Sequence, residues 1–298
     1  MRDVMIIGAG PAGLSAAIYC RRFMMKTTVI GQLFGGLLTT THFVENWPGE
    51  QRIQGSDLMK KIESHARATG AELINDEVKS VNKDKGFFKI KTSTNSYSAK
   101  SIIIATGTYH RRLGVKGEGD FYGKGVSYCA ACDAPFFKNK LVGVVGGSDS
   151  ACKEALLLSE HAKKVYIIYR KDKLRAEPII VERIKNSKNI EVINNTNVKS
   201  INGDKVLRSV SFDIGRELLL DGLFIAIGLV PQTNLIKSLG VKLNAKSEVI
   251  IDCHAKTNIK GVFAAGDCTD SPYKQAITGA AGGVIAAFNA YDYVESNI

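Results

Sequence analysis

The sequence predicts an α/β fold with two Rossmann-like, three-layer nucleotide-binding units. Two observations carry this prediction. A strand, a glycine-rich turn and a helix begin the chain over residues 4–22, and a second start of the same kind follows over residues 140–160. Two such starts in one chain indicate a duplicated architecture with two dinucleotide sites. The length of 298 residues suits one large or two ordinary domains.

The first start is a glycine fingerprint in its required setting, after a strand and before a helix. Residues 4–7 form the buried strand, and a helix is expected over residues 11–22. Gly8 permits the tight turn, Gly10 lets the backbone approach a pyrophosphate, and Gly13 lets the helix pack on the sheet. The helix N-terminus then offers free N–H groups to the phosphates. A glycine-rich turn without a ligand is the alternative. The predicted binding residues are Gly8, Gly10, Pro11, Ala12 and Gly13.

One part of the dinucleotide fingerprint is missing from the first unit. An Asp or Glu normally follows the second strand and binds ribose hydroxyls. Here the strand over residues 27–30 runs into Gly31, Gln32, Leu33 and Phe34 without a carboxylate. Gln32 is the polar side chain available in its place.

Two later strands end in residues that suit the neighbourhood of a cofactor. Residues 101–108 form an apolar strand that ends in Ala105-Thr106-Gly107. Residues 261–268 form another, which ends in Gly266-Asp267, and a helix of small residues opens at Tyr273–Ala276. Small residues let the chain pass close to a cofactor, and Asp267 is placed for flavin hydroxyls if a flavin lies there.

The second start has the same order of elements but an altered turn. Residues 140–145 form a strand, residues 152–160 a helix, and residues 165–169 the next strand. Ser148 stands where the fingerprint has its second glycine, which narrows the approach to a pyrophosphate. The predicted binding residues of this turn are Gly146, Gly147, Ser148, Asp149 and Ser150.

Basic residues follow the second strand of this unit, where the fingerprint for NAD has an acid. They are Arg170, Lys171 and Arg175. A cationic turn at this place accepts the 2′-phosphate of a ribose, so it favours NADPH over NADH. A solvated basic turn without a ligand is the alternative.

A Cys-x-x-Cys motif, Cys129-Ala130-Ala131-Cys132, precedes the second start. In a reducing compartment such a pair is either a redox disulfide or half of a zinc site. Zinc needs four ligands, normally with a second Cys or His pair at short spacing. The remaining cysteines, Cys20, Cys152, Cys253 and Cys268, stand singly, so the redox interpretation is favoured.

The composition narrows the class of protein. The net charge is +11, but the Lys and Arg residues are dispersed, which indicates a solvated basic surface rather than a nucleic-acid reader. No run approaches the roughly 18 apolar residues of a membrane span. The N-terminus enters a strand almost at once, leaving no room for a signal peptide. We therefore expect a cytoplasmic protein that has no membrane or nucleic-acid partner.

Five motifs occur together in one order: Gly8–Gly13, Val44–Gly49 (Val-Glu-Asn-Trp-Pro-Gly), Ala105–Gly107, Cys129–Asp133 and Gly261–Asp267. Through them the chain resembles the low-molecular-weight thioredoxin reductases, of the class II pyridine nucleotide-disulfide oxidoreductases, over essentially its whole length. The resemblance implies a homodimer. It also implies a discontinuous FAD-binding domain, residues 1–112 and 241–298, into which an NADPH-binding domain carrying the Cys pair, residues 113–240, is inserted.

The resemblance also implies the chemistry. Hydride passes from NADPH to FAD, and electrons then pass to the Cys129–Cys132 disulfide and to thioredoxin. Cys132 faces the flavin, Cys129 attacks the disulfide of the partner, and Asp133 is the general acid/base. Thiol–disulfide exchange needs a reactive thiolate and a proton source, which agrees with these roles. A charge at a helix N-terminus is the other interpretation of Asp133. Phe136 and Phe137 are either an apolar docking patch for thioredoxin or core residues.

The flavin-binding residues implied by the resemblance extend beyond the fingerprint. The further residues are Gly35, Gly36, Leu37, Thr40, Asn46, Ala105, Thr106, Gly107, Gly266, Asp267, Lys274, Gln275 and Ala276.

The chain departs from the family pattern at four positions. Tyr169 replaces a usual His, Ser148 a Gly, Leu37 a Gln, and Ala134 a Gly. The changes on the NADPH side leave room for a reduced deazaflavin or ferredoxin as the donor, and another small redox protein is an alternative acceptor. A redox sensor without turnover is a third hypothesis. The proton donor next to the Cys pair argues against it.

In the family, the NADPH domain rotates against the FAD domain, so that the nucleotide and the disulfide reach the flavin in turn. The chain is expected to cross between the domains near Leu113–Lys116 and Leu239–Val241. Glycines at both crossings are compatible with hinges.

Overall fold

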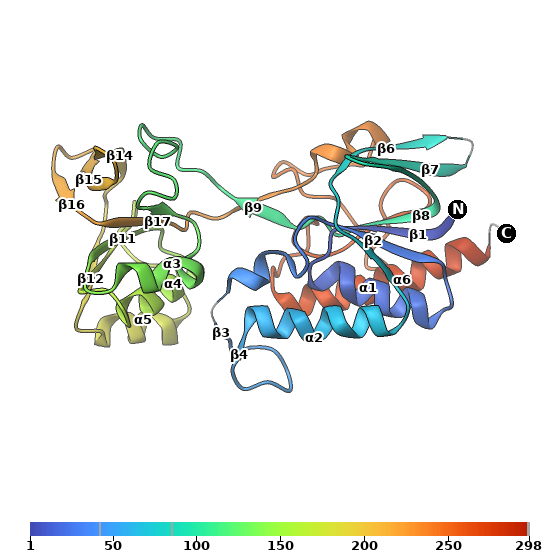
Figure 1. Cartoon of the computed structure of the whole chain (residues 1–298), viewed down its shortest axis with the longest axis horizontal. Coiled ribbons are helices and arrows are strands. Elements are labelled where there is room, and N and C mark those ends of the chain that lie inside the picture. Colours follow the sequence, from blue (N-terminus) through green and yellow to red (C-terminus); the bar gives the residue numbers. More distant parts are fainter. Residues whose placement is uncertain (42, 85, 297–298) are drawn as a thin grey trace. The chain divides into compact units, whose positions relative to one another are not determined.

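The computed structural model describes residues 1–41, 43–84 and 86–296, and it divides the chain into two compact units. The first unit comprises residues 1–109 and 230–298, and the second comprises residues 110–229. Figure 1 shows both units, each with helices on one face of a sheet. No helix in the described ranges is long and apolar enough to cross a membrane.

The first unit is built on a seven-stranded sheet. Four parallel strands lie in the order β5-β2-β1-β8, and β19 also pairs in parallel with β8. The antiparallel strands β7 and β6 continue the sheet beyond β8. The strand bounds are β1 Arg2–Ile7, β2 Thr27–Ile30, β5 Glu72–Ile74, β6 Val78–Asp84, β7 Phe87–Thr92, β8 Ser96–Ile104 and β19 Val262–Ala264.

Helices α1 (Pro11–Arg22), α2 (Gly55–Ala68) and α6 (Ala276–Glu295) belong to the first unit. The small residues of α6 let it lie against α1. A Cβ added to Gly283 would stand 2.1 Å from the carbonyl oxygen of Ala12. Figure 1 shows α1, α2 and α6 on one face of the sheet. Shorter elements of this unit are η1 (Gly36–Thr40), β3 (Phe43–Val44), β4 (Ile53–Gln54) and η3 (Asn234–Leu239).

The second unit has a parallel sheet of five strands in the order β10-β17-β11-β12-β13. A separate antiparallel sheet, β14-β15-β16, contributes to an apolar core with one face of the parallel sheet. On the other face of the parallel sheet, the helices of this unit pack against the strands and form a second apolar core. The strand bounds are β10 Val126–Ser127, β11 Leu141–Val145, β12 Lys164–Ile168, β13 Ile190–Ile193, β14 Val198–Gly203, β15 Leu207–Phe212, β16 Glu217–Leu219 and β17 Gly222–Ile225. The helices are α3 Ala130–Asp133, η2 Ala134–Phe137, α4 Asp149–Ser159 and α5 Pro178–Asn186.

The predicted two-unit α/β architecture is confirmed, and the predicted helix over residues 11–22 is α1. The predicted start of the helix in the second unit was wrong. Helix α4 begins at Asp149 rather than at residue 152, because the extended Ser148 is its N-cap and an acid in the first turn suits the helix dipole. The predicted opening of a helix at Tyr273–Ala276 is confirmed, since α6 begins at Ala276, where Gln275 and Thr278 form a capping box.

The chain crosses between the units at residues 109–110 and 229–230. The strands β9 (Thr108–His110) and β18 (Leu229–Pro231) pair with each other at these crossings. Residues 230–240 therefore belong to the first unit, and Ile236 is fully buried in its core.

Candidate active site

The two cysteines of the Cys-x-x-Cys motif are joined in a disulfide, with their Cα atoms 5.4 Å apart. Cys129 is the N-cap of α3, and its Sγ accepts the backbone N–H of Cys132 over 3.1 Å. The hydroxyl of Ser127 accepts the backbone N–H of Cys129 over 3.0 Å. Cys132 is exposed and Cys129 is half-buried. The disulfide is thus held at the start of α3, and Cys132 is accessible to solvent.

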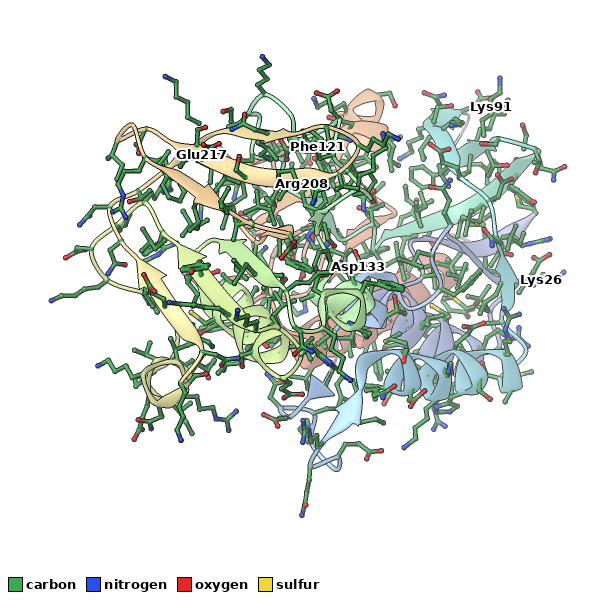
Figure 2. All side chains as sticks on the ribbon, turned by 60° about the vertical axis from the view of Figure 1, so that its left-hand side comes forward. Lys26, Lys91, Phe121, Asp133, Arg208 and Glu217 are labelled. Atoms are coloured by element: carbon green, nitrogen blue, oxygen red, sulfur yellow. A yellow bond between two sulfur atoms is a disulfide. The ribbon has the colours of Figure 1, made fainter. Side chains whose placement is uncertain are left out.

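The residues after the disulfide divide between solvent and core. Asp133 is the last residue of α3 and is half-buried (Figure 2). Phe136 is 73% exposed, whereas Phe137 is buried against Phe224 with the ring centroids 5.3 Å apart. Phe137 is therefore a core residue, and Phe136 alone is available to a docking protein.

The first glycine turn has the geometry that a pyrophosphate needs. Gly8 has φ +113°, and a Cβ there would lie 2.1 Å from the carbonyl oxygen of Ala105, so the turn packs against the end of β8. The nearest described atom to a Cβ on Gly10 would be the Cα of Gly36, at 4.0 Å, so Gly10 leaves room for a close approach. Among the described residues, no side chain caps the start of α1. Its free N–H groups fit the phosphates of a flavin dinucleotide.

A loop from later in the chain lies beside this turn. The N–H of Gly35 donates to the carbonyl oxygen of Ala9 over 2.7 Å. Gly35 and Gly36 both have positive φ, and Gly36 begins η1, which also contains Leu37 and Thr40. The amide of Asn46 donates to the side chain of Gln275 over 3.0 Å. The structure therefore brings Gly35 to the turn before α1, and Asn46 to the residue before α6.

The strand ends predicted to lie near a flavin meet at one edge of the sheet. Ala105 follows β8 and donates to the carbonyl oxygen of Ile7 at the end of β1. Ala265 follows β19 and donates to Ile104. Burial raises the pKa of the Asp267 carboxyl, which Lys274 partly offsets. Two glycine-lined strand ends and the half-buried Asp267 fit the isoalloxazine and ribityl side of a flavin.

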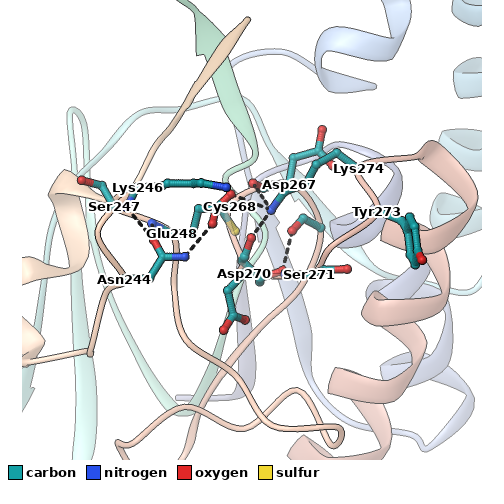
Figure 3. Close-up of polar contacts among 12 residues, drawn as sticks. Asn244, Lys246, Ser247, Glu248, Asp267, Cys268, Asp270, Ser271, Tyr273 and Lys274 are labelled. Carbon is teal, nitrogen blue, oxygen red and sulfur yellow. Dashed lines mark hydrogen bonds and ion pairs between the residues drawn. The ribbon is translucent and has the colours of Figure 1, made fainter. Parts of the chain in front are cut away.

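Lys274 is engaged with the protein itself (Figure 3). Its Nζ pairs with a carboxylate oxygen of Glu248 over 3.1 Å and donates to the backbone oxygen of Thr269. The other carboxylate oxygen of Glu248 accepts the amide of Asn244 over 2.6 Å. Lys274 thus ties the segment before α6 to the loop at residues 244–248.

The second glycine turn is more closed than the first. A Cβ on Gly146 would lie 2.3 Å from the carbonyl oxygen of Ala226, and one on Gly147 would lie 2.5 Å from the ring of Tyr169. The carboxylate of Asp149 accepts the N–H of Glu177 over 2.6 Å. Ser148 and Ser150 lie at the start of α4. The turn therefore packs against the segment that follows β12.

The basic residues lie next to this turn. The N–H of Arg175 donates to the carbonyl oxygen of Gly147, and its Nε donates to the hydroxyl of buried Tyr169 over 3.1 Å. Arg170, Lys171 and Arg175 are exposed, and within the described ranges none forms an ion pair with a carboxylate. Unpaired cations beside a glycine turn fit the 2′-phosphate of NADPH.

Sequence reasoning missed two acids, Glu118, which binds Tyr128 beside Cys129, and Glu248, which pairs with Lys274. Each stands in a loop, where single acids are normally solvated, so the sequence gives no signal for them. Glu118 is 6% exposed, and the side chain of Glu248 is 14% exposed. Only the burial of each carboxylate and its hydrogen bonds identify it.

Two dinucleotide-type units and a disulfide in a Cys-x-x-Cys motif define a nucleotide-dependent disulfide oxidoreductase. Comparisons with known proteins agree. The pattern of the pyridine nucleotide-disulphide oxidoreductase family matches residues 2–283. A thioredoxin reductase of Listeria innocua is 43% identical over 98% of this chain and 94% of its own length.

Two solved structures are similar throughout. Lactococcus lactis thioredoxin reductase has a TM-score of 0.96 at 38% identity, with 99% of this chain and 100% of that chain covered. The T. acidophilum thioredoxin reductase has a TM-score of 0.93 at 39% identity, with 100% and 99% covered. The chain therefore belongs to the thioredoxin reductases of the pyridine nucleotide-disulphide oxidoreductase family. It is a flavoprotein oxidoreductase, as the resemblance in its sequence predicts.

Proposed function

We propose that the enzyme moves two electrons from NADPH, through FAD, to the Cys129–Cys132 disulfide and on to thioredoxin. The formed disulfide at the start of α3 carries this proposal, because it is the oxidised member of a dithiol couple. The first unit, with its open glycine turn, binds FAD. The second unit carries the Cys pair and binds NADPH through its glycine turn and basic residues. A bound flavin accepts hydride from a nicotinamide and delivers two electrons to a disulfide.

The exchange steps follow from cysteine chemistry. Two electrons and two protons convert the disulfide to two thiols. The thiolate of Cys129 attacks a sulfur of the thioredoxin disulfide, and a thiolate leaves the partner. The thiolate of Cys132 then attacks the Cys129 sulfur, which re-forms the enzyme disulfide and releases the thioredoxin dithiol. Asp133, at the end of α3, supplies and recovers the proton.

An anaerobic absorbance titration tests the donor. NADPH is expected to bleach the flavin quickly, and NADH to do so weakly. A flavin that neither nucleotide bleaches would overturn NADPH as the donor.

Variants of the cysteines test the disulfide route separately. Cys132→Ser and Cys129→Ser should each retain flavin and lose thioredoxin reduction by at least about a thousandfold, since neither can form the disulfide. A third variant, Cys253→Ser, changes an exposed free cysteine and should keep full activity. Full activity in either of the first two variants would contradict the route.

The proposed homodimer is supported by an apolar stripe on α6. Ile277, Ala281, Ile285 and Phe288 are exposed and recur at helical spacing. Phe288→Asp should give a monomer by light scattering, whereas Tyr273→Asp, outside the stripe, should leave the dimer intact. A monomeric wild-type enzyme would contradict the homodimer.

We also propose a cytoplasmic location. Cys20, Cys152, Cys253 and Cys268 are free thiols, as is usual for proteins in a reducing compartment.

A further inference from the structure

One buried carboxylate joins the segment after the first crossing to the loop that carries the disulfide. Glu118 is 6% exposed and accepts the backbone N–H groups of Leu113 and Gly114, over 2.7 and 2.6 Å. It also accepts the hydroxyl of Tyr128. We call Glu118, Leu113, Gly114 and Tyr128 the Glu118 network. The carboxylate oxygen Oε1 accepts both the N–H of Leu113 and the hydroxyl of Tyr128, and Oε2 accepts the N–H of Gly114.

Tyr128 immediately precedes the redox-active Cys129. Its ring lies 5.9 Å from that of His110 and 5.8 Å from that of Tyr122, between ring centroids. The tyrosine side chain is therefore packed among residues that follow the first crossing. Because the next residue is Cys129, any movement of Tyr128 is transmitted to the backbone of the disulfide loop.

The ionisation states of Glu118 and Tyr128 strengthen the hydrogen bond between them. Burial raises the pKa of Glu118, but the hydrogen bonds from Tyr128, Leu113 and Gly114 outweigh it, so this pKa is lowered overall. Burial and the Glu118 carboxylate together raise the pKa of Tyr128. Near neutral pH the pair is thus an ionised carboxylate and a neutral phenol, which is the stronger kind of hydrogen bond.

We propose that Tyr128 and Glu118 are positioning residues for the disulfide. They fix the backbone of Cys129 relative to residues 110–114, and so hold the Cys129–Cys132 pair in the orientation that electron transfer from the flavin needs. Loss of the phenol hydroxyl leaves the ring packed but frees the loop. The rate of electron transfer depends on how the disulfide is oriented toward the flavin. We therefore expect electron transfer to the disulfide to become about tenfold slower.

The test compares Tyr128→Phe and Glu118→Gln with Tyr122→Phe in the flavin-loaded enzyme. Tyr122→Phe removes the same hydroxyl from a neighbouring ring that is 64% exposed and lies outside the network. Stopped-flow absorbance separates flavin reduction by the nicotinamide from flavin reoxidation by the disulfide. The first step should keep its rate in all three variants. The second should slow about tenfold in Tyr128→Phe and Glu118→Gln only.

Amide hydrogen exchange gives a readout that is independent of activity. In Tyr128→Phe and Glu118→Gln, peptides covering residues 126–133 should exchange about tenfold faster than in the wild type, whereas Tyr122→Phe should not change them. Unchanged exchange and unchanged reoxidation in Tyr128→Phe would overturn the proposal. Equal slowing by Tyr122→Phe, or equal slowing of both half-reactions, would also overturn it, because either result indicates a general loss of structure.

Discussion

The Nε of Arg175 donates to the hydroxyl of Tyr169 over 3.1 Å, and the ring of Tyr169 covers the backbone of Gly147. Tyr169 is 5% exposed, so its position is fixed by packing. Arg175 is exposed, and its bond to a buried partner orients the guanidinium beside the second glycine turn. The tyrosine that departs from the family pattern thus supports the cation proposed for the 2′-phosphate.

Tyr169→Phe should therefore weaken the use of NADPH selectively. Loss of one hydrogen bond to a charged group predicts a fall of about tenfold in kcat/KM for NADPH, mainly through KM, with little change for NADH. Arg175→Gln should cost more with the same selectivity. Steady-state kinetics with both nucleotides checks this, and Tyr166→Phe in β12 serves as the control. Equal losses with both nucleotides would contradict the orienting role.

Glu248→Gln should weaken the retention of flavin. The change removes the ion pair with Lys274, and with it the tie between the loop at residues 244–248 and the segment before α6. We expect about tenfold faster flavin release in dialysis or dilution assays. Glu50→Gln removes a more exposed ion pair with Lys61 and should leave release unchanged. If Glu248→Gln released flavin at the wild-type rate, the Glu248–Lys274 ion pair would not contribute to flavin retention.

Glu154 makes stability depend on pH. Its Oε2 is buried without a hydrogen-bond partner in the described part of the chain, and burial raises the pKa of the carboxyl to about 8. Below the ordinary pKa of 4.5, the carboxyl is protonated in both the folded and the unfolded state, so it does not lower the free energy of unfolding. As the pH rises from 4.5 to 8 only the unfolded state ionises, so the free energy of unfolding falls, by about 3–5 kcal/mol in total.

Glu154→Gln should remove most of this fall, because the amide does not ionise. Denaturant unfolding at pH 5, 6, 7 and 8 measures it. Glu160→Gln, an exposed change at the end of α4, is the matched control and should keep the wild-type slope. The same slope in wild type and Glu154→Gln would refute this source of pH dependence.

Gly283→Ala should destabilise the first unit strongly. The added Cβ would lie 2.1 Å from the carbonyl oxygen of Ala12, so α6 and α1 must separate. Overpacking of this kind costs about 1–3 kcal/mol or more, which calorimetry detects as a lower Tm. Gly282→Ala, whose Cβ would meet its nearest atom at 3.6 Å, should be neutral or stabilising. Equal Tm values for the two variants would contradict close helix packing.

Local sequence patterns predicted the parts of the fold that depend on short-range rules. The glycine turns at Gly8 and Gly146 were predicted because a tight strand-to-helix turn needs a positive φ, and both residues have one. The start of α4 was predicted three residues late, since Asp149 and Ser150 are as common in turns as in first helical turns. Phe136 and Phe137 were indistinguishable in sequence, because burial depends on the opposing Phe224.

By itself, the sequence determined the α/β class, the two dinucleotide turns, the redox-active pair and the family, because each rests on residue types at fixed short spacing. Tertiary structure alone decided what Glu118, Glu248 and Glu154 do. Whether a carboxylate is solvated, hydrogen-bonded or buried without a partner depends on groups far away in the chain. Glu248 meets Lys274, and Glu118 meets Tyr128, only after the chain has folded. Desolvation and the placement of hydrogen-bond donors, rather than residue identity, set the behaviour of such groups.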